Sequence, residues 1–113
     1  MAEACIFCRI AKGEIPAEMV ANNRDIAAFR DLNPQAPVHI LIIPKKHIPS
    51  LDDTGDTYLL GQMLSLATAI ARQEKIAKTG YRTVINTGKD GGQSVDHLHL
   101  HLLGVRPFAW PPG

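Results

Sequence analysis

The sequence predicts an α+β domain in which about five strands form a meander-like antiparallel sheet, accompanied by one long and one short helix. Two segments, 37–44 and 97–105, are rich in apolar residues and have strand-like patterns. Residues 54–79 instead repeat their apolar side chains at the 3.6-residue spacing of an amphipathic helix. Turn-forming Asn, Asp, Gly and Pro separate these segments, as is typical of strands joined by short connections.

The N-terminal third alternates short regular segments with turns. Residues 5–13 are expected to form a short helical turn that Gly13 ends. Residues 18–21 and 26–31 are predicted strands, because the Asn-Asn-Arg-Asp sequence between them favours a turn. Residues 37–44 are apolar except for His39, so this strand should lie centrally with both faces covered. The sequence leaves two interpretations of His39 open: a core histidine bonded to a backbone carbonyl, or a group that supports the neighbouring histidine-rich strand.

The long predicted helix covers residues 54–79. Asp52 and Asp53 precede it and, together with Thr54, can cap its first turn. Lys78 and Gly80 are typical of a helix end. Its apolar stripe should pack on one face of the sheet and consists of Leu60, Met63, Leu64, Ala67, Ile70 and Ala71.

The last third carries the chemistry. A strand at 81–86 leads into a glycine-rich loop at 87–94, which precedes a strand predicted from about His97 to Val105. Side chains alternate across a strand, so His97, His99 and His101 should share one face and the intervening leucines the other. Three aligned imidazoles are poor core fillers and indicate a metal site or phosphoryl chemistry. Glycines in the loop let backbone N–H groups converge on an anion.

Length and charge limit the classes of function. A chain of 113 residues fits one domain, 1–113, with residues 106–113 as a tail, and a domain this small is a natural candidate for dimerisation. The net charge of +1 gives no electrostatic footprint for nucleic-acid polymers or membranes. The sequence has neither a secretory signal nor an apolar run of the roughly 20 residues that span a membrane, so a cytoplasmic location is expected.

Cys5 and Cys8 have the Cys-x-x-Cys spacing of a zinc half-site. The residues alone leave three interpretations: metal ligands, a redox pair, or two small apolar side chains on a helical turn. A structural disulfide is not expected in a reducing compartment.

Several motifs together resemble the histidine triad (HIT) family, in particular its purine nucleoside phosphoramidase branch. The segments that carry the resemblance are His97-Leu98-His99-Leu100-His101-Leu102-Leu103, Asp31-Leu32-Asn33-Pro34-Gln35-Ala36-Pro37-Val38-His39, Ile43-Pro44-Lys45-Lys46-His47-Ile48, Gly91-Gly92-Gln93-Ser94-Val95 and Trp110-Pro111-Pro112-Gly113. They follow one another in order over essentially the whole chain. Residues Pro107-Phe108-Ala109 depart from the pattern, which leaves tail-based substrate selection open.

The resemblance implies a dimeric hydrolase of purine nucleoside phosphoramidates that needs no cofactor for catalysis. His99 would be the nucleophile and would form a nucleotidyl-histidine, and its second ring nitrogen would be fixed by a hydrogen bond to the carbonyl of His97. His101 would contact the phosphate, Ser94 would bond near the leaving amine, and His39 would join a proton relay. His97 completes the catalytic triad, unless zinc takes its side chain and leaves it only to anchor the strand.

The resemblance also implies a nucleotide site and a structural zinc site. Asp31 would accept hydrogen bonds from the ribose, and Ile6, Ile10, Phe29 and Leu32 would sandwich the base. Asn86 and the Gly92-Gln93-Ser94-Val95 amides would hold the phosphate, together with His99 and His101. Trp110 would extend towards the active site of a partner subunit. Zinc would bind Cys5, Cys8, His47 and His97.

Two other functions remain open at this stage. One is a nucleotide-binding or scaffold module with negligible turnover. The other is a dinucleoside polyphosphate hydrolase or nucleotidyl transferase, since related HIT branches catalyse these reactions. By resemblance, the Trp110-Pro111-Pro112 ending favours phosphoramidate cleavage over both.

Overall fold

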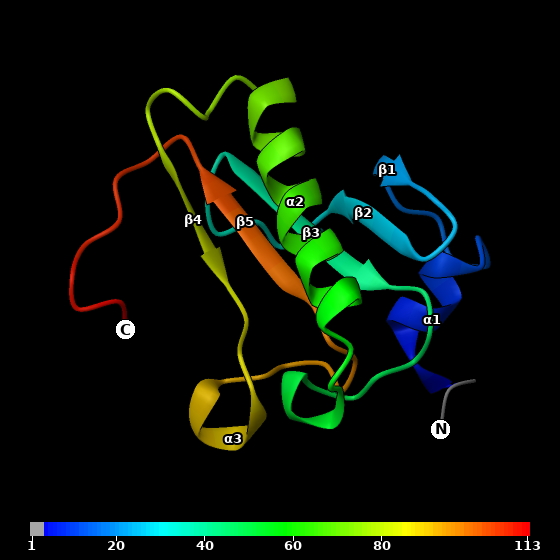
Figure 1. Ribbon diagram of the computed structural model, residues 1–113. Helices are drawn as coiled ribbons and strands as arrows, with labels where there is room; N and C mark the ends of the chain where they lie inside the picture. The colour runs from blue at the N-terminus through cyan, green and yellow to red at the C-terminus, as the bar shows by residue number, and fades with distance from the viewer. Residues whose placement is uncertain (1–3) are drawn as a thin grey trace.

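The computed structural model describes residues 4–113 and is built on a five-stranded antiparallel sheet (Figure 1). The strands lie in the order β1-β2-β3-β5-β4, and every neighbouring pair is antiparallel. They span Met19–Asn22 (β1), Ile26–Arg30 (β2), Val38–Pro44 (β3), Tyr81–Val84 (β4) and Leu100–Gly104 (β5). The helices span Ile6–Ala11 (α1), Thr57–Gln73 (α2) and Gly88–Gly91 (α3), and Leu51–Asp53 forms a short 3-10 turn (η2).

The predicted fold class is confirmed, and the topology refines it. Only β1, β2 and β3 follow one another as a meander; β5 then lies between β3 and β4. The long helix α2 separates β3 from β4 in sequence, so the chain reaches the far edge of the sheet before its last strand fills the gap. The glycine-rich segment predicted to be a loop contains the short helix α3, which ends at Gly92 in the left-handed conformation.

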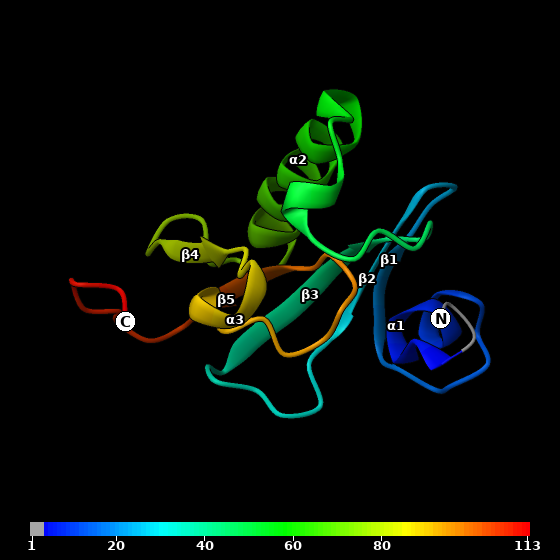
Figure 2. The same ribbon diagram turned by 90° about the horizontal axis from the view of Figure 1, so that it is seen from below.

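The two faces of the sheet are covered by different helices. In Figure 2, α2 lies over one face, and α1 lies towards the other side beside β2. Alternation along β3 explains this division: Ile40 and Ile42 pack with α2, whereas Leu41 and Ile43 pack with α1. The predicted leucine face of the C-terminal segment is confirmed, because Leu98, Leu100 and Leu102 belong to the α2 side of the core.

Helix α2 is shorter than the predicted span of 54–79. Asp56 caps its start by accepting a hydrogen bond from the Leu59 N–H at 3.0 Å. At its end, Lys75 takes a left-handed conformation and Ile76 N–H bonds back to the Ala71 carbonyl at 2.9 Å, which is a Schellman motif. The sequence predicted the helix end near Gly80, because glycine is the usual residue in the left-handed conformation that ends a helix. In the structure Lys75 takes that conformation, which is unusual for a lysine. Leu64, predicted in the apolar stripe, is 48% exposed.

The strand predicted from His97 begins instead at Leu100. Continued past Leu100, the β3–β5 pairing would bring Pro44 opposite Leu98, and proline has no N–H to donate. The Leu98 N–H bonds instead to the Ile48 carbonyl at 2.7 Å. His97 and His99 therefore lie in an irregular segment just before β5. Within residues 4–113, no helix has the length and apolar content needed to cross a membrane.

Two glycines give opposite predictions for stability. A Cβ at Gly104 would lie 2.7 Å from Cδ1 of Ile76, a side chain that is itself buried, so Gly104→Ala is expected to cost about 1–3 kcal/mol by overpacking. Gly61 lies within α2 with open space around it, so Gly61→Ala is expected to stabilise by about 1 kcal/mol. Urea unfolding measures both. Adding Ile76→Val to Gly104→Ala should recover part of the loss, and no recovery would contradict the assigned clash.

Candidate functional site

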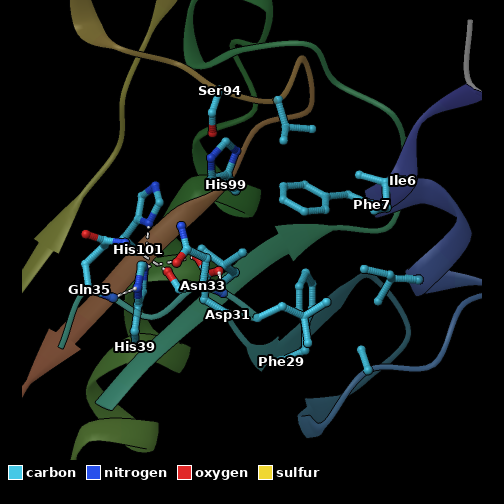
Figure 3. A pocket seen from close by; sticks show the side chains of 15 residues that line it. Ile6, Phe7, Phe29, Asp31, Asn33, Gln35, His39, Ser94, His99 and His101 are labelled. Carbon is cyan, nitrogen blue, oxygen red and sulfur yellow. Dashed lines mark hydrogen bonds and ion pairs between the residues drawn. The ribbon is translucent and has the colours of Figure 1, made fainter. Parts of the chain in front are cut away.

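A cavity of about 400 Å³ opens between α1, the ends of β2 and β3, and the segment that leads into β5. Figure 3 shows its lining, with the phenyl rings of Phe7 and Phe29 on one side and the histidines on the other. The lining residues are Ile6, Phe7, Ile10, Ala17, Phe29, Asp31, Leu32, Asn33, Gln35, His39, Leu41, Ser94, Val95, His99 and His101. One wall is thus apolar and the other carries hydrogen-bonding groups.

Most of the residues expected to bind nucleotide line this cavity, while five of the predicted catalytic and nucleotide-binding residues lie elsewhere. His97 lies beside the cysteines, and Asn86, Gly92, Gln93 and Trp110 are outside the lining. Gln93 braces its loop: its Nε2 donates to the carbonyls of Pro49 and Val95 at 2.7 and 2.9 Å. Trp110 is 82% exposed on the C-terminal tail, which runs beyond β4 at the other end of the sheet from α1 (Figures 1 and 2).

His99 has a defined proton arrangement. Its Nδ1–H donates to the carbonyl of His97 at 2.6 Å, as the sequence predicted. A neutral imidazole with its proton on Nδ1 carries its lone pair on Nε2. The ring is 3% exposed, and the edge of the Phe7 ring packs against it with centroids 5.1 Å apart. The hydrogen bond therefore leaves Nε2 as the ring nitrogen of His99 that carries the lone pair when the imidazole is neutral.

His39 and His101 form a second fixed arrangement. The backbone N–H of Gln35 donates to His39 Nδ1 at 3.0 Å, so the neutral His39 ring carries its proton on Nε2. That proton is donated to His101 Nδ1 at 2.9 Å, which leaves the His101 proton on Nε2. His101 Nε2 is buried and has no hydrogen-bond partner within residues 4–113. His101 lines the cavity (Figure 3), so an acceptor atom of a ligand that reached this N–H would complete its hydrogen bonding.

The surroundings keep these rings neutral. Burial, and after it the neighbouring His99 and His39 rings, lower the pKa of His101 to about 4, although the Asp31 carboxylate opposes them. Burial also lowers the pKa of His39, although the Asp31 carboxylate, whose Oδ2 lies 3.4 Å from Nε2, opposes this effect. Two neutral rings can keep the directional N–H to N bond between them, which two imidazolium ions could not.

The predicted metal ligands Cys5, Cys8, His47 and His97 lie together, with all donor atoms within 4.8 Å of one another. The Nδ1 atom of His97 lies 3.2 and 3.5 Å from the sulfurs of Cys5 and Cys8, and Cys8 Sγ lies 3.2 Å from His47 Nδ1. Tetrahedral zinc with usual bond lengths would place sulfur and nitrogen ligands roughly 3.5 Å apart. The His97 Nε2–H donates to the Pro44 carbonyl at 2.8 Å, which turns the Nδ1 lone pair towards the thiols. These residues fit a four-coordinate metal site.

Asp31, His39 and His101 also lie within 4.8 Å of one another, yet their hydrogen bonds do not fit a metal site. A metal on His39 Nε2 would displace the proton that this nitrogen carries, and the proton could not move to Nδ1, which already accepts from the Gln35 N–H. The His39 Nε2–H and His101 Nδ1 bond each other instead. This group is a hydrogen-bond relay, whereas the cysteine group presents free lone pairs.

Phe7 and Gln35 are site residues that sequence reasoning did not assign. Phe7 packs edge-on against Phe29, His97 and His99, and so separates the metal-type cluster from the cavity. Gln35 acts through its backbone N–H, which no pattern of side chains reveals. Leu41 also lines the cavity, and the sequence could have predicted it. It lies two residues after His39 in β3, and residues two apart on a strand share a face.

Comparisons with known proteins agree with this geometry. The family model described as HIT domain matches residues 12–108. The purine nucleoside phosphoramidase of Escherichia coli is 50% identical over 96% of this chain and 92% of its own length. An uncharacterized HIT-like protein of Synechococcus elongatus is 54% identical over the full length of both chains.

Solved structures give the same result. A HIT family hydrolase from Legionella pneumophila superposes with a TM-score of 0.94 at 52% identity, over 96% of this chain and 99% of that one. A histidine triad protein from Clostridium difficile superposes with a TM-score of 0.90 at 44% identity, over 93% of each chain.

Acid is expected to destabilise the fold through His101. Its pKa is about 4 in the folded protein, whereas a histidine in an unfolded chain titrates near 6.5, so the unfolded state binds more protons between these values. The stabilisation is complete above about pH 6.5 and is lost, at up to about 1.4 kcal/mol per pH unit, as the pH falls towards 4. Urea unfolding at pH 7, 6 and 5 with a metal chelator measures this slope. His101→Gln should flatten it, and an unchanged slope would contradict the assignment.

Proposed function

The chain belongs to the HIT family, and on that premise we propose that it hydrolyses purine nucleoside phosphoramidates through a covalent nucleotidyl-histidine at His99. The observation that carries the proposal is the 2.6 Å hydrogen bond from His99 Nδ1–H to the His97 carbonyl, which leaves Nε2 as a lone-pair donor. The phosphoramidase of Escherichia coli, at 50% identity, supports the choice of substrate.

The first step transfers the nucleotidyl group to the enzyme. His99 Nε2 attacks the α-phosphorus, the new N–P bond forms, and the P–N bond to the amine breaks as the amine takes up a proton. The imidazole becomes cationic in this intermediate. Its Nδ1–H already donates to the His97 carbonyl, so the positive charge develops beside a fixed dipole. Ser94 lines the cavity and would hydrogen-bond near the leaving amine.

The second step releases the nucleotide. Water attacks phosphorus, the N–P bond breaks, and His99 returns to the neutral ring with its lone pair on Nε2. In both steps the Nε2–H of His101 would donate to a phosphate oxygen, because it is buried in the cavity lining and lacks a protein partner. His39 holds that proton in place by donating to His101 Nδ1.

The apolar end of the cavity suits a nucleobase. Ile6, Ile10 and Phe29 line it, and Leu32 projects from the next loop with 82% of its surface exposed. Asp31 stands between this end and the histidines, where its carboxylate would accept hydrogen bonds from the ribose hydroxyls. A nucleoside phosphate bound in this direction would place its α-phosphorus near His99.

We also propose that the protein acts as a cytoplasmic homodimer, with Trp110 of one subunit extending towards the cavity of the other. The exposed indole, at 82%, supports a role outside its own chain's cavity. The two free cysteines support a reducing compartment.

Replacing the nucleophile tests the proposed chemistry. His99→Ala is expected to lower kcat for adenosine 5′-phosphoramidate by at least about a thousandfold, because the covalent route is lost, while mononucleotide binding persists. Tyr58→Ala, which changes an exposed side chain of α2 outside the cavity, is the matched control and should retain full activity. An unchanged rate in His99→Ala would reject the nucleophile.

Tight nucleotide binding without turnover in the wild type would favour a binding module, and faster cleavage of dinucleoside polyphosphates would favour the other HIT activity.

We further propose that Cys5, Cys8, His47 and His97 hold a structural zinc ion. Protein produced without added zinc is expected to contain about one zinc ion per chain, and Cys8→Ser should lose it and unfold at lower temperature. Asp31→Asn is the control, because the Asp31, His39 and His101 group does not fit a metal. Metal analysis of the three proteins decides: zinc retained in Cys8→Ser, or lost in Asp31→Asn, would contradict the assignment.

A further inference from the structure

Arg106 connects the C-terminal tail to the loop that precedes β3. Its Nε–H donates to the backbone carbonyl of Gln35 at 2.9 Å, across 71 residues of sequence. Its Nη1 donates to the Pro107 carbonyl at 3.2 Å, and its guanidinium stacks over the Phe108 ring at 4.2 Å. The exposed Arg106 side chain thus has three contacts, of which only the bond to Gln35 reaches a segment distant in sequence.

The backbone before Arg106 is strained in a way that serves this contact. Val105 has a φ of 70°, in the left-handed region that a β-branched residue rarely adopts. This conformation turns the chain at the end of β5, immediately before Arg106 leaves the sheet. Strain that persists in a native fold often marks a functional constraint.

Gln35 uses both of its backbone groups. Its carbonyl accepts from Arg106, and its N–H donates to His39 Nδ1 at 3.0 Å. Its side chain bonds the Asn33 carbonyl at 3.1 Å, and Asn33 N–H in turn bonds Asp31 Oδ1 at 2.8 Å. Arg106 ties this loop to the segment that follows β5, the strand beside β3. The N–H of Gln35 meanwhile selects which nitrogen of His39 is protonated.

We propose that Arg106 is a positioning residue that fixes the tautomers of His39 and His101 through the backbone of Gln35. Its effect on rate rests on the proposed hydrolase function; its effect on the tautomers does not. Arg106 touches neither histidine and does not line the cavity.

Loss of the Arg106 contact frees Gln35 to rotate its N–H away from His39. His39 then gains access to the tautomer with the proton on Nδ1 and the lone pair on Nε2. Its bond with His101 can persist only if His101 donates from Nδ1, and the lone pair of His101 then faces the cavity in place of a proton. One proton on each ring is conserved, but the donor for a phosphate oxygen is lost.

Arg82 provides a matched control for this role. It stacks over the same Phe108 ring at 5.2 Å and donates from Nη2 to the Ala109 carbonyl at 3.0 Å. It therefore anchors the tail as Arg106 does, but it makes no contact with Gln35. A residue that only holds the tail would behave alike at both positions.

The test combines spectra and kinetics on the full-length protein. Long-range ¹H–¹⁵N spectra of the imidazoles are recorded for the wild type, Arg106→Ala, Arg106→Lys and Arg82→Ala. The wild type and Arg82→Ala should show His39 and His101 as single Nε2–H tautomers, whereas Arg106→Ala should show mixtures at both rings. Arg106→Lys, which can still donate one hydrogen bond, should lie between them. For phosphoramidate hydrolysis, kcat should fall about tenfold in Arg106→Ala with little change in KM, and by less than about twofold in Arg82→Ala.

The outcomes are separable. Unmixed Nε2–H tautomers in Arg106→Ala would overturn the proposal, as would equal effects of the two alanine variants. Should Arg106→Ala fail to fold, Arg106→Lys decides by the same spectra. Should the wild type lack phosphoramidase activity, the proposed function fails while the tautomer populations still decide the role of Arg106.

Discussion

The site depends on the hydrogen bond between His99 Nδ1–H and the carbonyl of His97, two residues earlier in the chain. At 2.6 Å it fixes which nitrogen of His99 carries the proton and which carries the lone pair. His97 precedes β5, and β4 ends at Val84 opposite His101, so no strand pairs with the His97 carbonyl. That carbonyl accepts from the His99 side chain instead, and in a neutral ring this leaves the lone pair on Nε2.

Backbone groups also select the tautomers of other histidines. The Pro44 carbonyl accepts from His97, and the Gln35 N–H donates to His39. The tautomer of His101 then follows from its hydrogen bond with His39. The consequences differ with the group that each free nitrogen meets. For His97 the free lone pair faces two thiols, which suits a metal. For His101, a residue of the cavity wall, the buried Nε2–H has no acceptor within residues 4–113, which suits an anion.

Alternation along strands carried most of the sequence prediction. It placed the leucines of 98–102 in the core. The resemblance to the HIT family supplied the rest: the pairing of His39 with the histidine-rich segment, and the set Cys5, Cys8, His47 and His97, which lie together. Alternation could not place the start of β5 or the end of α2. The first depends on a proline in the neighbouring strand, and the second on a lysine in a left-handed conformation. The role of Gln35 could not be predicted either. Its backbone N–H makes the contact with His39, and that contact is independent of the side chain.

The chemical identity of the covalent intermediate is the decisive measurement for the nucleophile. Wild-type protein is mixed with a purine nucleoside phosphoramidate, quenched within one turnover at alkaline pH, digested and mapped. We expect a nucleotidyl group on His99, attached through Nε2, because the Nδ1–H donates to the His97 carbonyl. Attachment through Nδ1, or a modified residue other than His99, would contradict it.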